Sequence, residues 1–268
     1  RSFLTLLGVI IGVASVVLVG AAIDGLGVYA EVTTSKAFGT DSYMIAQITS
    51  TGRLSRTELA ARLRRNKRVR QEDLDYLRAA TGDRILYSPY RQKVQDIKRG
   101  ALTDESVNIL GVSSVMPEIR DITLVEGRFF TESEARNRQP VAVIGQDVLT
   151  SLFPGVTPLG KTIKFNGFDF LVIGVQERRG SSFGMPQDNC VWIPDTVFNR
   201  LYGPGLTLAL FGRPRPGSGL TLEDSLDLTR VALRTRYHTR PGQPDNFDNL
   251  TPDSIRSFID NILGMIAR

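Results

Sequence analysis

The feature that most constrains this chain is an uncharged apolar stretch near its beginning. The run FLTLLGVIIGVASVVLVGAAI, residues 3–23, holds 21 successive residues without a charge. At about 1.5 Å of rise per residue, a helix of this length spans the roughly 30 Å hydrocarbon core of a bilayer. A secretory signal peptide usually has a shorter apolar run, of about 7–15 residues. The stretch therefore predicts a transmembrane helix.

The pattern continues beyond the membrane. Gly8 and Gly12 would let a second helix approach closely, although small residues are also simply frequent in membrane helices. After the apolar run, loose helical spacing persists to about residue 38, so we expect a stalk that projects from the bilayer. Apolar residues at that spacing are Ile23, Leu26, Tyr29, Ala30 and Phe38.

The charges are distributed unevenly. The 268-residue chain has 33 Lys and Arg against 28 Asp and Glu, a net charge of +5. The segment from Arg53 to Arg70 holds eight basic residues and only one acid, Glu58. The rest of the chain is slightly acidic, which argues against a nucleic-acid binder with Lys and Arg spread over a whole face. We interpret the basic segment as a solvated helix and loop, with contact to anionic lipid or an acidic partner as the alternative.

Cysteine and histidine are too few for metal or disulfide chemistry. Cys190 and His238 are the only residues of their kinds, so neither an internal disulfide nor a zinc site can be built from them. Cys190 lies in the apolar run NCVWIP, where we expect it to be a small buried hydrophobe.

Strands and helices alternate after the stalk. Strands are predicted at 42–49, 84–97, 106–113, 140–146, 162–165, 168–175, 189–194 and 206–212, the second of them weakened by Pro89. Helices are predicted at 56–65, 72–82, 147–153, 195–203, 221–238 and 251–268. One face of the 221–238 helix is expected to carry Leu222, Leu226, Thr229, Leu233 and Tyr237.

This order predicts an α+β fold in which two strand-helix-strand units bracket a small inserted β-rich subdomain. Because the chain starts with Arg and ends inside a predicted helix, we expect it to be a piece of a longer polypeptide. The expected parts are a transmembrane helix and stalk (1–38), a core domain in two pieces (39–123 and 189–250), the inserted subdomain (124–188) and an amphipathic helix (251–268).

The last helix has the clearest pattern. Thr251 can cap it and Pro252 suits its first turn. Its apolar face either packs on its own domain or leads into a second membrane helix. The residues of that face are Ile255, Phe258, Ile259, Ile262, Leu263 and Ile266.

The stretch GVTPLGKT, residues 155–162, fits the pattern of a phosphate-binding loop. Such a loop needs a strand before its glycines and a helix after its lysine, because the loop amides and the helix N-terminus hold the phosphates. Here a short helix precedes Gly155, and two apolar runs joined by Asn166 and Gly167 follow Lys161. Asn-Gly between such runs is a strong hairpin signal. We therefore predict a β-hairpin rather than a nucleotide site.

The stretch GSSFG, residues 180–184, has the nucleophile-elbow pattern around Ser182. Asp224 or Asp227, and then His238, follow in an order found in catalytic triads. An elbow needs a helix directly after the serine, whereas MPQD here leads into another strand, so we interpret the stretch as a polar hairpin loop.

The stretch DGLGVYA, residues 24–30, resembles a dinucleotide fingerprint but follows a bilayer-length run instead of a short strand. No catalytic, cofactor-binding or metal-binding residue and no cofactor is therefore predicted.

The order of these elements resembles the MacB-like (FtsX-like) permeases of ABC transporters, specifically their first membrane helix and extracytoplasmic core domain. No one motif is diagnostic, but the order and spacing of four stretches together are specific. They are RSFLTLLGVIIGVASVVLVGAAIDG, NILGVSSVMPEIRDITLVEGRFFTESE, PVAVIGQDVLTSLFPGVTPLGKTIKFNGFDFLVIGV and VWIPDTVFNRL. In that family GRFFTE and PLGKTIKFNGFDFLVIGV would lie in the inserted subdomain.

The resemblance implies a permease of the plasma (inner) membrane, with residues after about 24 outside the cytoplasm. Its partners would be an ABC ATPase subunit or domain, a second permease in a homodimer or heterodimer, membrane lipid and a periplasmic or outer-membrane protein. ATP hydrolysis would belong to the ATPase, so this chain is not expected to be an enzyme. Substrates such as lipoproteins or toxic peptides would be exported or extracted on the outer side, through motion passed along the two terminal helices.

Two other classes stay open on the residues alone. The extracytoplasmic sensor domain of a membrane receptor also places an α+β domain between two membrane helices. A secreted hydrolase would instead be cleaved near Ala21 and released.

Overall fold

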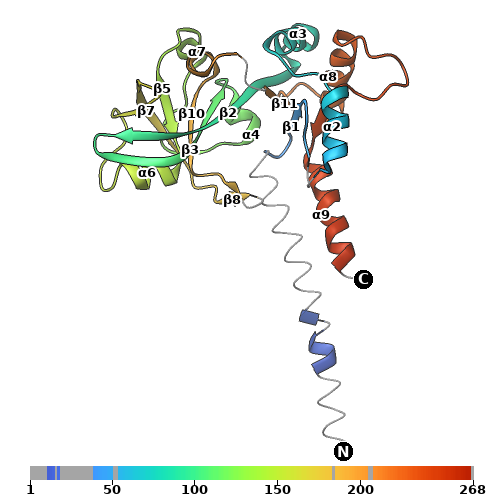
Figure 1. Cartoon of the computed structure of the whole chain (residues 1–268), viewed down its shortest axis with the longest axis horizontal. Coiled ribbons are helices and arrows are strands. Elements are labelled where there is room, and N and C mark those ends of the chain that lie inside the picture. Colours follow the sequence, from blue (N-terminus) through green and yellow to red (C-terminus); the bar gives the residue numbers. More distant parts are fainter. Residues whose placement is uncertain are drawn as a thin grey trace, which may run out of the picture.

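The computed structural model describes residues 11–15, 17–18, 39–50, 54–182, 185–204 and 208–266, without the side chains of residues 182, 185, 260 and 262–266. Its main sheet has the strand order β12-β1-β11-β2-β3-β10-β5-β7-β4, and β6 pairs with β7 and with β2 (Figure 1). These strands are β1 (Tyr43–Ala46), β2 (Ile85–Arg99), β3 (Leu102–Val112), β4 (Leu124–Gly127), β5 (Val141–Ile144), β6 (Thr162–Phe165), β7 (Phe168–Gln176), β10 (Cys190–Pro194), β11 (Ala209–Pro214) and β12 (Asp248–Leu250).

Helices cover the sheet, and one short ribbon lies apart from it. The helices are α2 (Arg56–Arg65), α3 (Gln71–Thr81), α4 (Met116–Arg120), α5 (Glu132–Arg136), α6 (Gln146–Leu152), α7 (Asp195–Tyr202), α8 (Leu222–Arg236) and α9 (Pro252–Ile266), with a single 3-10 turn at Gly82–Arg84. β8 (Ser181–Ser182) and β9 (Met185–Pro186) pair with each other only.

Every strand and helix predicted between residues 42 and 266 is present, and most ends agree within a few residues. Pro89 does not interrupt β2. It stands opposite Leu210 of β11, and β2 begins to pair with β3 only at the next residue, Tyr90. Pro89 therefore lies where β2 changes from having one neighbour to having two, which is where the sheet best tolerates a missing N–H donor.

Alternation along the strands divides the core between the two faces of the sheet. Ile85 and Tyr87 pack with α3 and α8 on one face, whereas Leu86 packs with α4 on the other. Successive side chains of a strand point to opposite faces, so a sheet covered on both sides needs apolar residues at consecutive positions. The strand β5, VAVI, is buried at all four positions for this reason.

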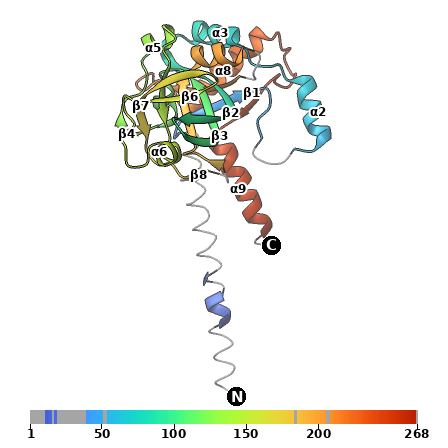
Figure 2. The same ribbon diagram turned by 60° about the vertical axis from the view of Figure 1, so that its left-hand side comes forward.

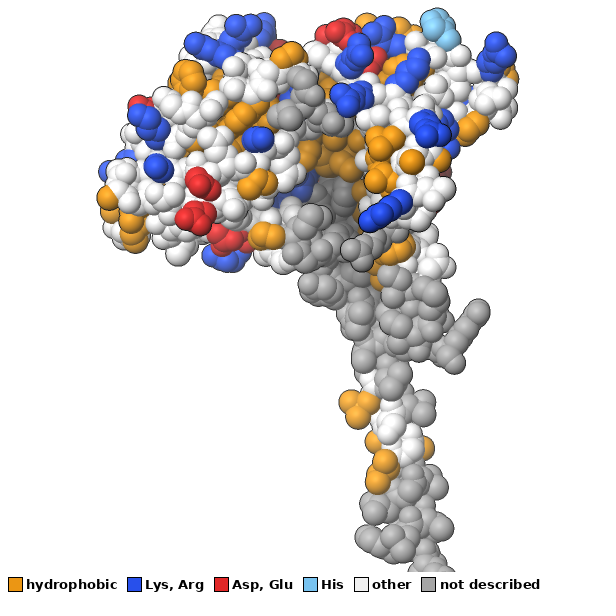
Figure 3. Space-filling view, viewed as in Figure 1, with side chains coloured by type: hydrophobic (Ala, Val, Ile, Leu, Met, Phe, Trp, Pro, Cys, Tyr) orange, Lys and Arg blue, Asp and Glu red, His pale blue; other side chains and the backbone are white. Residues whose placement is uncertain are grey.

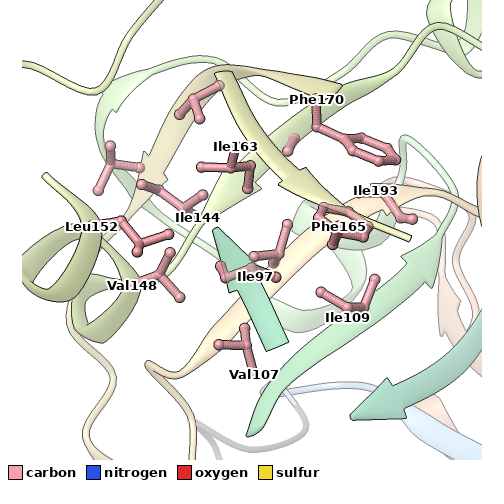
Figure 4. Packing of buried hydrophobic residues seen from close by; sticks show 14 of the residues in the cluster. Ile97, Val107, Ile109, Ile144, Val148, Leu152, Ile163, Phe165, Phe170 and Ile193 are labelled. Carbon is pink, nitrogen blue, oxygen red and sulfur yellow. The ribbon is translucent and has the colours of Figure 1, made fainter. Parts of the chain in front are cut away.

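A third cluster fills the part of the molecule around β6, β7 and α6 (Figure 4). Phe165 and Phe170 stack at its centre with ring centroids 4.1 Å apart. The cluster also includes Ile97 of β2 and Ile109 of β3. This part of the sheet therefore shares its core with the long hairpin that β2 and β3 form.

The predicted hairpin after Lys161 is confirmed. β6 and β7 pair antiparallel with Phe165 opposite Phe168. The two turn residues have positive φ, 49° at Asn166 and 81° at Gly167, as a two-residue type I′ turn requires. Thr162 thus begins a strand, not the helix of a phosphate-binding loop.

The two C-terminal helices form as their sequences predict. On α8, Leu226, Thr229, Leu233 and Tyr237 are buried and Leu222 packs against the same cluster. On α9, the Ser254 N–H donates to Thr251 Oγ1 at 3.1 Å, which is the expected cap, and Ile255 is buried. α9 leaves the domain on the side where the helical residues 11–15 and 17–18 also lie (Figures 1 and 2).

Most of the predicted transmembrane helix, residues 3–23, and the stalk to residue 38 fall outside the described residues. The described parts, 11–15 and 17–18, are helical and exposed. Within the residues that the structure describes, no helix is both long enough and apolar enough to cross a membrane.

Candidate functional site at the two attachments of the domain

The chain enters and leaves the domain through two adjacent strands. β1 and β12 pair antiparallel, with Met44 opposite Leu250 and Ala46 opposite Asp248. Because the strands run in opposite directions, the start of β1 and the end of β12 lie at one end of the sheet. We call residues 39–43 the incoming segment and residues 248–251 the outgoing segment.

The incoming segment is fastened to the C-terminal end of α4. Thr40 donates from its backbone N and its Oγ1 to Asp121 Oδ2, at 2.9 and 2.6 Å. Gly39, with φ at +88°, lies so close to α4 that a Cβ would stand 2.6 Å from the carbonyl oxygen of Ile119. A larger residue at position 39 would therefore push the incoming segment away from α4.

Asp121 also ties this contact to the sheet. The Nη1 of Arg213, on β11, lies 2.6 Å from Asp121 Oδ1. Partial burial alone would raise the pKa of Asp121, but the hydrogen bonds from Thr40 and the Arg213 guanidinium outweigh it and lower the pKa below the usual value. The carboxylate is thus held in its charged form while it joins the incoming segment, α4 and β11.

A buried hydroxyl network anchors the first residue of β1 to the opposite side of the sheet. The Tyr43 hydroxyl lies 2.7 Å from Thr229 Oγ1 and 3.0 Å from Ser225 Oγ, both on α8. The Tyr87 hydroxyl of β2 reaches the same Thr229 oxygen at 2.6 Å. Burial raises the pKa of Tyr43, so its hydroxyl stays protonated. β1, β2 and α8 are thereby joined through polar atoms as well as through apolar contacts.

Arg179 links α4 to the loop that carries β8 and β9. Its guanidinium donates to the carbonyl oxygens of Asp121 and Arg120 at 3.2 and 3.3 Å. The buried carboxylate of Asp188 accepts the N–H groups of Arg179 and Gly180 at 2.7 and 2.8 Å. Burial, together with the neighbouring positive charge of Arg120, lowers the pKa of Arg179 to about 10.

Arg120 places a buried charge between aromatic rings. Its guanidinium carbon lies 5.3–5.9 Å from the ring centroids of Tyr90, Trp192 and Phe211, which come from β2, β10 and β11. A cation over an aromatic face is stabilised by about 2 kcal/mol or more where water is excluded. Through the Arg120 side chain, the last turn of α4 therefore contacts three strands of the sheet.

The outgoing segment has its own polar centre at Asp248. Its carboxylate accepts from Arg62 Nη1 at 2.9 Å and from Asn66 Nδ2 at 2.8 Å, and Arg65 lies 3.6 Å away. The Thr49 N–H, just after β1, reaches the same carboxylate at 3.3 Å. Asp248 therefore joins the end of α2 and the end of β1 to the strand that leads into α9.

These contacts join each attachment to several elements of the domain. Each charge-assisted hydrogen bond contributes about 1.5–3 kcal/mol, and several act together on each attachment. The incoming segment is thus bonded to α4 and α8 and, through Asp121, to β11, and the outgoing segment is bonded to α2 and β1.

The residues of the rejected hydrolase motif are not brought together. Asp224 caps the start of α8 with Thr221, and Asp227 pairs with Arg230 at 2.6 Å. His238 follows the other end of that helix, so the rise per residue puts it roughly 20 Å from Asp224. The side chain of Ser182 lies outside the described residues.

The remaining chemistry-bearing side chains do not converge either. Cys190 is buried as predicted, and burial raises the pKa of its thiol to about 12. Among the described residues, no group of three or more His, Cys, Asp or Glu side chains could hold a metal ion.

Sequence reasoning missed both carboxylates of this site. Asp121 has a left-handed backbone, with φ at 49°, just after the five-residue helix α4. A helix this short has no sequence pattern from which its end could be predicted. For Asp248 the sequence held an indirect signal. The basic helix α2 carries Arg62 and Arg65, and arginines that pack against the domain usually meet a carboxylate there.

Two solved structures share the fold. The periplasmic region of MacB from Actinobacillus actinomycetemcomitans matches with a TM-score of 0.64 at 18% identity, over 85% of this chain and 96% of that one. The extracellular domain of the noncanonic ABC-type transporter YknZ from Gram-positive bacteria matches with a TM-score of 0.57 at 16% identity, over 78% and 100%. The fold thus defines the class, an α+β domain with the architecture that these two regions share.

The sequence comparisons give the family. The family model of the MacB-like periplasmic core domain matches residues 2–232. The macrolide export ATP-binding/permease protein MacB of Neisseria gonorrhoeae is 29% identical over 98% of this chain and 38% of its own length, and that of Bdellovibrio bacteriovorus is 32% identical over 76% and 30%. The chain belongs to the MacB-like periplasmic core domain family, as the resemblance of its four stretches predicted, and spans well under half the length of these relatives.

Proposed function

We propose that this chain is the first membrane helix and extracytoplasmic domain of an ABC transporter permease of the MacB type. Residues 3–23 would cross the plasma (inner) membrane, and residues after about 24 would lie outside the cytoplasm. Besides the family, the exposed helical side chains at positions 11–15 and 17–18 support this arrangement. Ile11, Val13, Val17 and Leu18 are 57–70% exposed, which suits contact with lipid and not with water.

We propose the same division of the chain as the sequence suggests. It comprises 1–38 as membrane helix and stalk, 39–123 and 189–250 as the core domain, 124–188 as the inserted subdomain, and 251–268 as a helix leading towards a second membrane span. The cluster around β6, β7 and α6 takes most of its residues from 124–188, which supports an inserted unit, although it also includes residues of β2, β3, β10 and α7.

The partners follow from the relatives. Their names join an ATP-binding function to a permease, so an ABC ATPase, fused or separate, would hydrolyse ATP in the cytoplasm. The permease would pair with a second copy or a related chain. This domain would act without catalysis of its own and would export or extract substrate on the outer side of the membrane.

The observation that carries the mechanism is the pairing of β1 with β12. Both attachments emerge at one end of the sheet, and each is fixed to helices and strands through a buried or half-buried carboxylate. A tilt or separation of the membrane helices would therefore rotate the whole domain as a rigid body.

Insertion of a flexible Gly/Ser linker after Gly27, made in the intact transporter, tests this proposal. We expect the insertion to abolish export, measured with a macrolide as the probe, and to leave ATP hydrolysis intact. The same linker inserted after Gly100, in the exposed turn between β2 and β3, is the control and should leave both activities intact. Full macrolide export by the Gly27 insertion would show that a rigid stalk is not required.

A further inference from the structure

An open groove lies at the end of the domain that α3 and α8 form. It has a volume of about 590 Å³ and runs between the link from α2 to α3 and the C-terminal end of α8. Its lining is mainly polar and basic: Gln47, Asn66, Lys67, Arg68, Arg70, Glu72, Asp73, Arg236 and Tyr237.

One of the two acids in this groove is already fully engaged. The carboxylate of Asp73 accepts from Arg236 Nε at 2.8 Å, from the Tyr237 hydroxyl at 2.9 Å and from the backbone N of Arg70 at 2.9 Å. Asp73 is buried, so its charge is neutralised within the wall of the groove. This leaves Glu72 as the single exposed acid of the lining.

The exposed charge on the lining is therefore positive. Lys67, Arg68 and Arg70 are exposed within four residues of chain, and Glu72 is the one exposed acid that lines the groove with them. The Lys67 ammonium lies 5.0 Å from the Tyr237 ring centroid and donates to the Tyr237 carbonyl oxygen at 3.3 Å, which fixes it at the groove. Arginine guanidinium groups bind carboxylates in a bidentate manner, so this surface suits a ligand that presents several carboxylates.

The position of the groove favours a protein over the membrane surface. α3 and α8 lie at the end of the domain opposite to α9 and the helical residues 11–15 and 17–18 (Figures 1 and 2). Lys and Arg side chains gather at that end in the space-filling view (Figure 3). Under the membrane placement proposed above, the lipid headgroups lie at the other end of the domain, and exposed charges interact only within about 10 Å at ordinary ionic strength.

We propose that an acidic segment of a partner protein binds in this groove, with its carboxylates on Lys67, Arg68 and Arg70. The proposal gives a role to the C-terminal part of the basic segment, whose inner arginines, Arg62 and Arg65, are instead paired with Asp248. It does not depend on the coupling mechanism above, because binding can be measured without ATP.

A binding measurement with the full chain in nanodiscs of neutral phosphatidylcholine tests the proposal. The probe is a fluorescent peptide of ten glutamates, and the reference is a ten-residue Gly/Ser/Gln peptide. The test variant is Arg68→Glu with Arg70→Glu. The control variant, Lys93→Glu with Lys98→Glu, makes the same change of charge at exposed positions on β2.

We expect saturable binding of the glutamate peptide that weakens with added salt and is retained by the control variant. The test variant should bind about tenfold more weakly or worse, because attraction at two sites becomes repulsion. Equal binding by the two variants, or binding of the reference peptide, would overturn the proposal. So would binding of the full chain to phosphatidylglycerol vesicles through Arg68 and Arg70 without binding of the peptide, since that would assign the groove to a membrane.

Discussion

Asp248 is the residue on which α2, β1 and the outgoing segment converge, and its side chain is only 10% exposed. Asp248→Ala would leave Arg62 and Asn66 without their shared acceptor. We expect the free energy of unfolding to fall by about 2–3 kcal/mol, followed in detergent by the fluorescence of the buried Trp192. The matched control, Asp83→Ala, removes a fully exposed partner of Arg215 and should leave the free energy of unfolding nearly unchanged. Equal losses in the two variants would contradict this account of Asp248.

Glu134 gives a residue-scale prediction for pH. Arg128 donates two hydrogen bonds to the Glu134 carboxylate, at 2.7 and 2.8 Å. These hydrogen bonds are the main reason that the pKa of Glu134 is lowered from 4.5 to about 2. A lowered folded-state pKa gives stability that is present above about pH 4.5 and lost as the pH falls through about 2. Glu134→Gln should therefore be less stable than the parent at pH 7, by about 1 kcal/mol because Arg128 is half exposed. The difference in stability should shrink as the pH falls below about 4.5 and vanish below about pH 2. A difference that stays constant over this range would disprove the assignment.

At the scale of elements, the β6–β7 hairpin depends on its turn. Gly167 has φ at +81°, a region in which a side chain costs about 1–2 kcal/mol. Gly167→Ala should lower the free energy of unfolding by that amount, as measured by chemical denaturation. Gly167→Asn should cost clearly less, because asparagine tolerates the left-handed region. Equal costs for Ala and Asn would indicate that the turn is not the cause.

The same elements show what the sequence could and could not predict. The hairpin was predictable from Asn166-Gly167, α8 from the apolar spacing that includes Leu226, and α9 from the cap at Thr251, because each of these signals is local in the sequence. β12 has three residues and no pattern of its own, because it forms only by pairing with β1, some 200 positions earlier along the chain. The candidate site was hidden for the same reason, since Thr40 meets Asp121 at a separation of 81 residues.

At the scale of the whole molecule, the proposed coupling requires rigid attachment of the domain. The incoming and outgoing segments share one end of the sheet, and strand pairing continues from β12 to β4. Under the proposed function, motion that enters at β1 or β12 would reach the far part of the domain around β6 and β7. In the proposed pair of permeases it would change the relative position of the two copies, which can be measured.

The most direct measurement is the distance between spin labels on the two copies of the intact transporter, with the label on Lys93→Cys. Lys93 is exposed on β2, whereas Cys190 is buried with a raised thiol pKa and should not take the label. Our account predicts that ATP changes this distance, and that the linker after Gly27 abolishes the change while ATP hydrolysis continues. An ATP-dependent change that survives the linker, or no change in the parent protein, would contradict it.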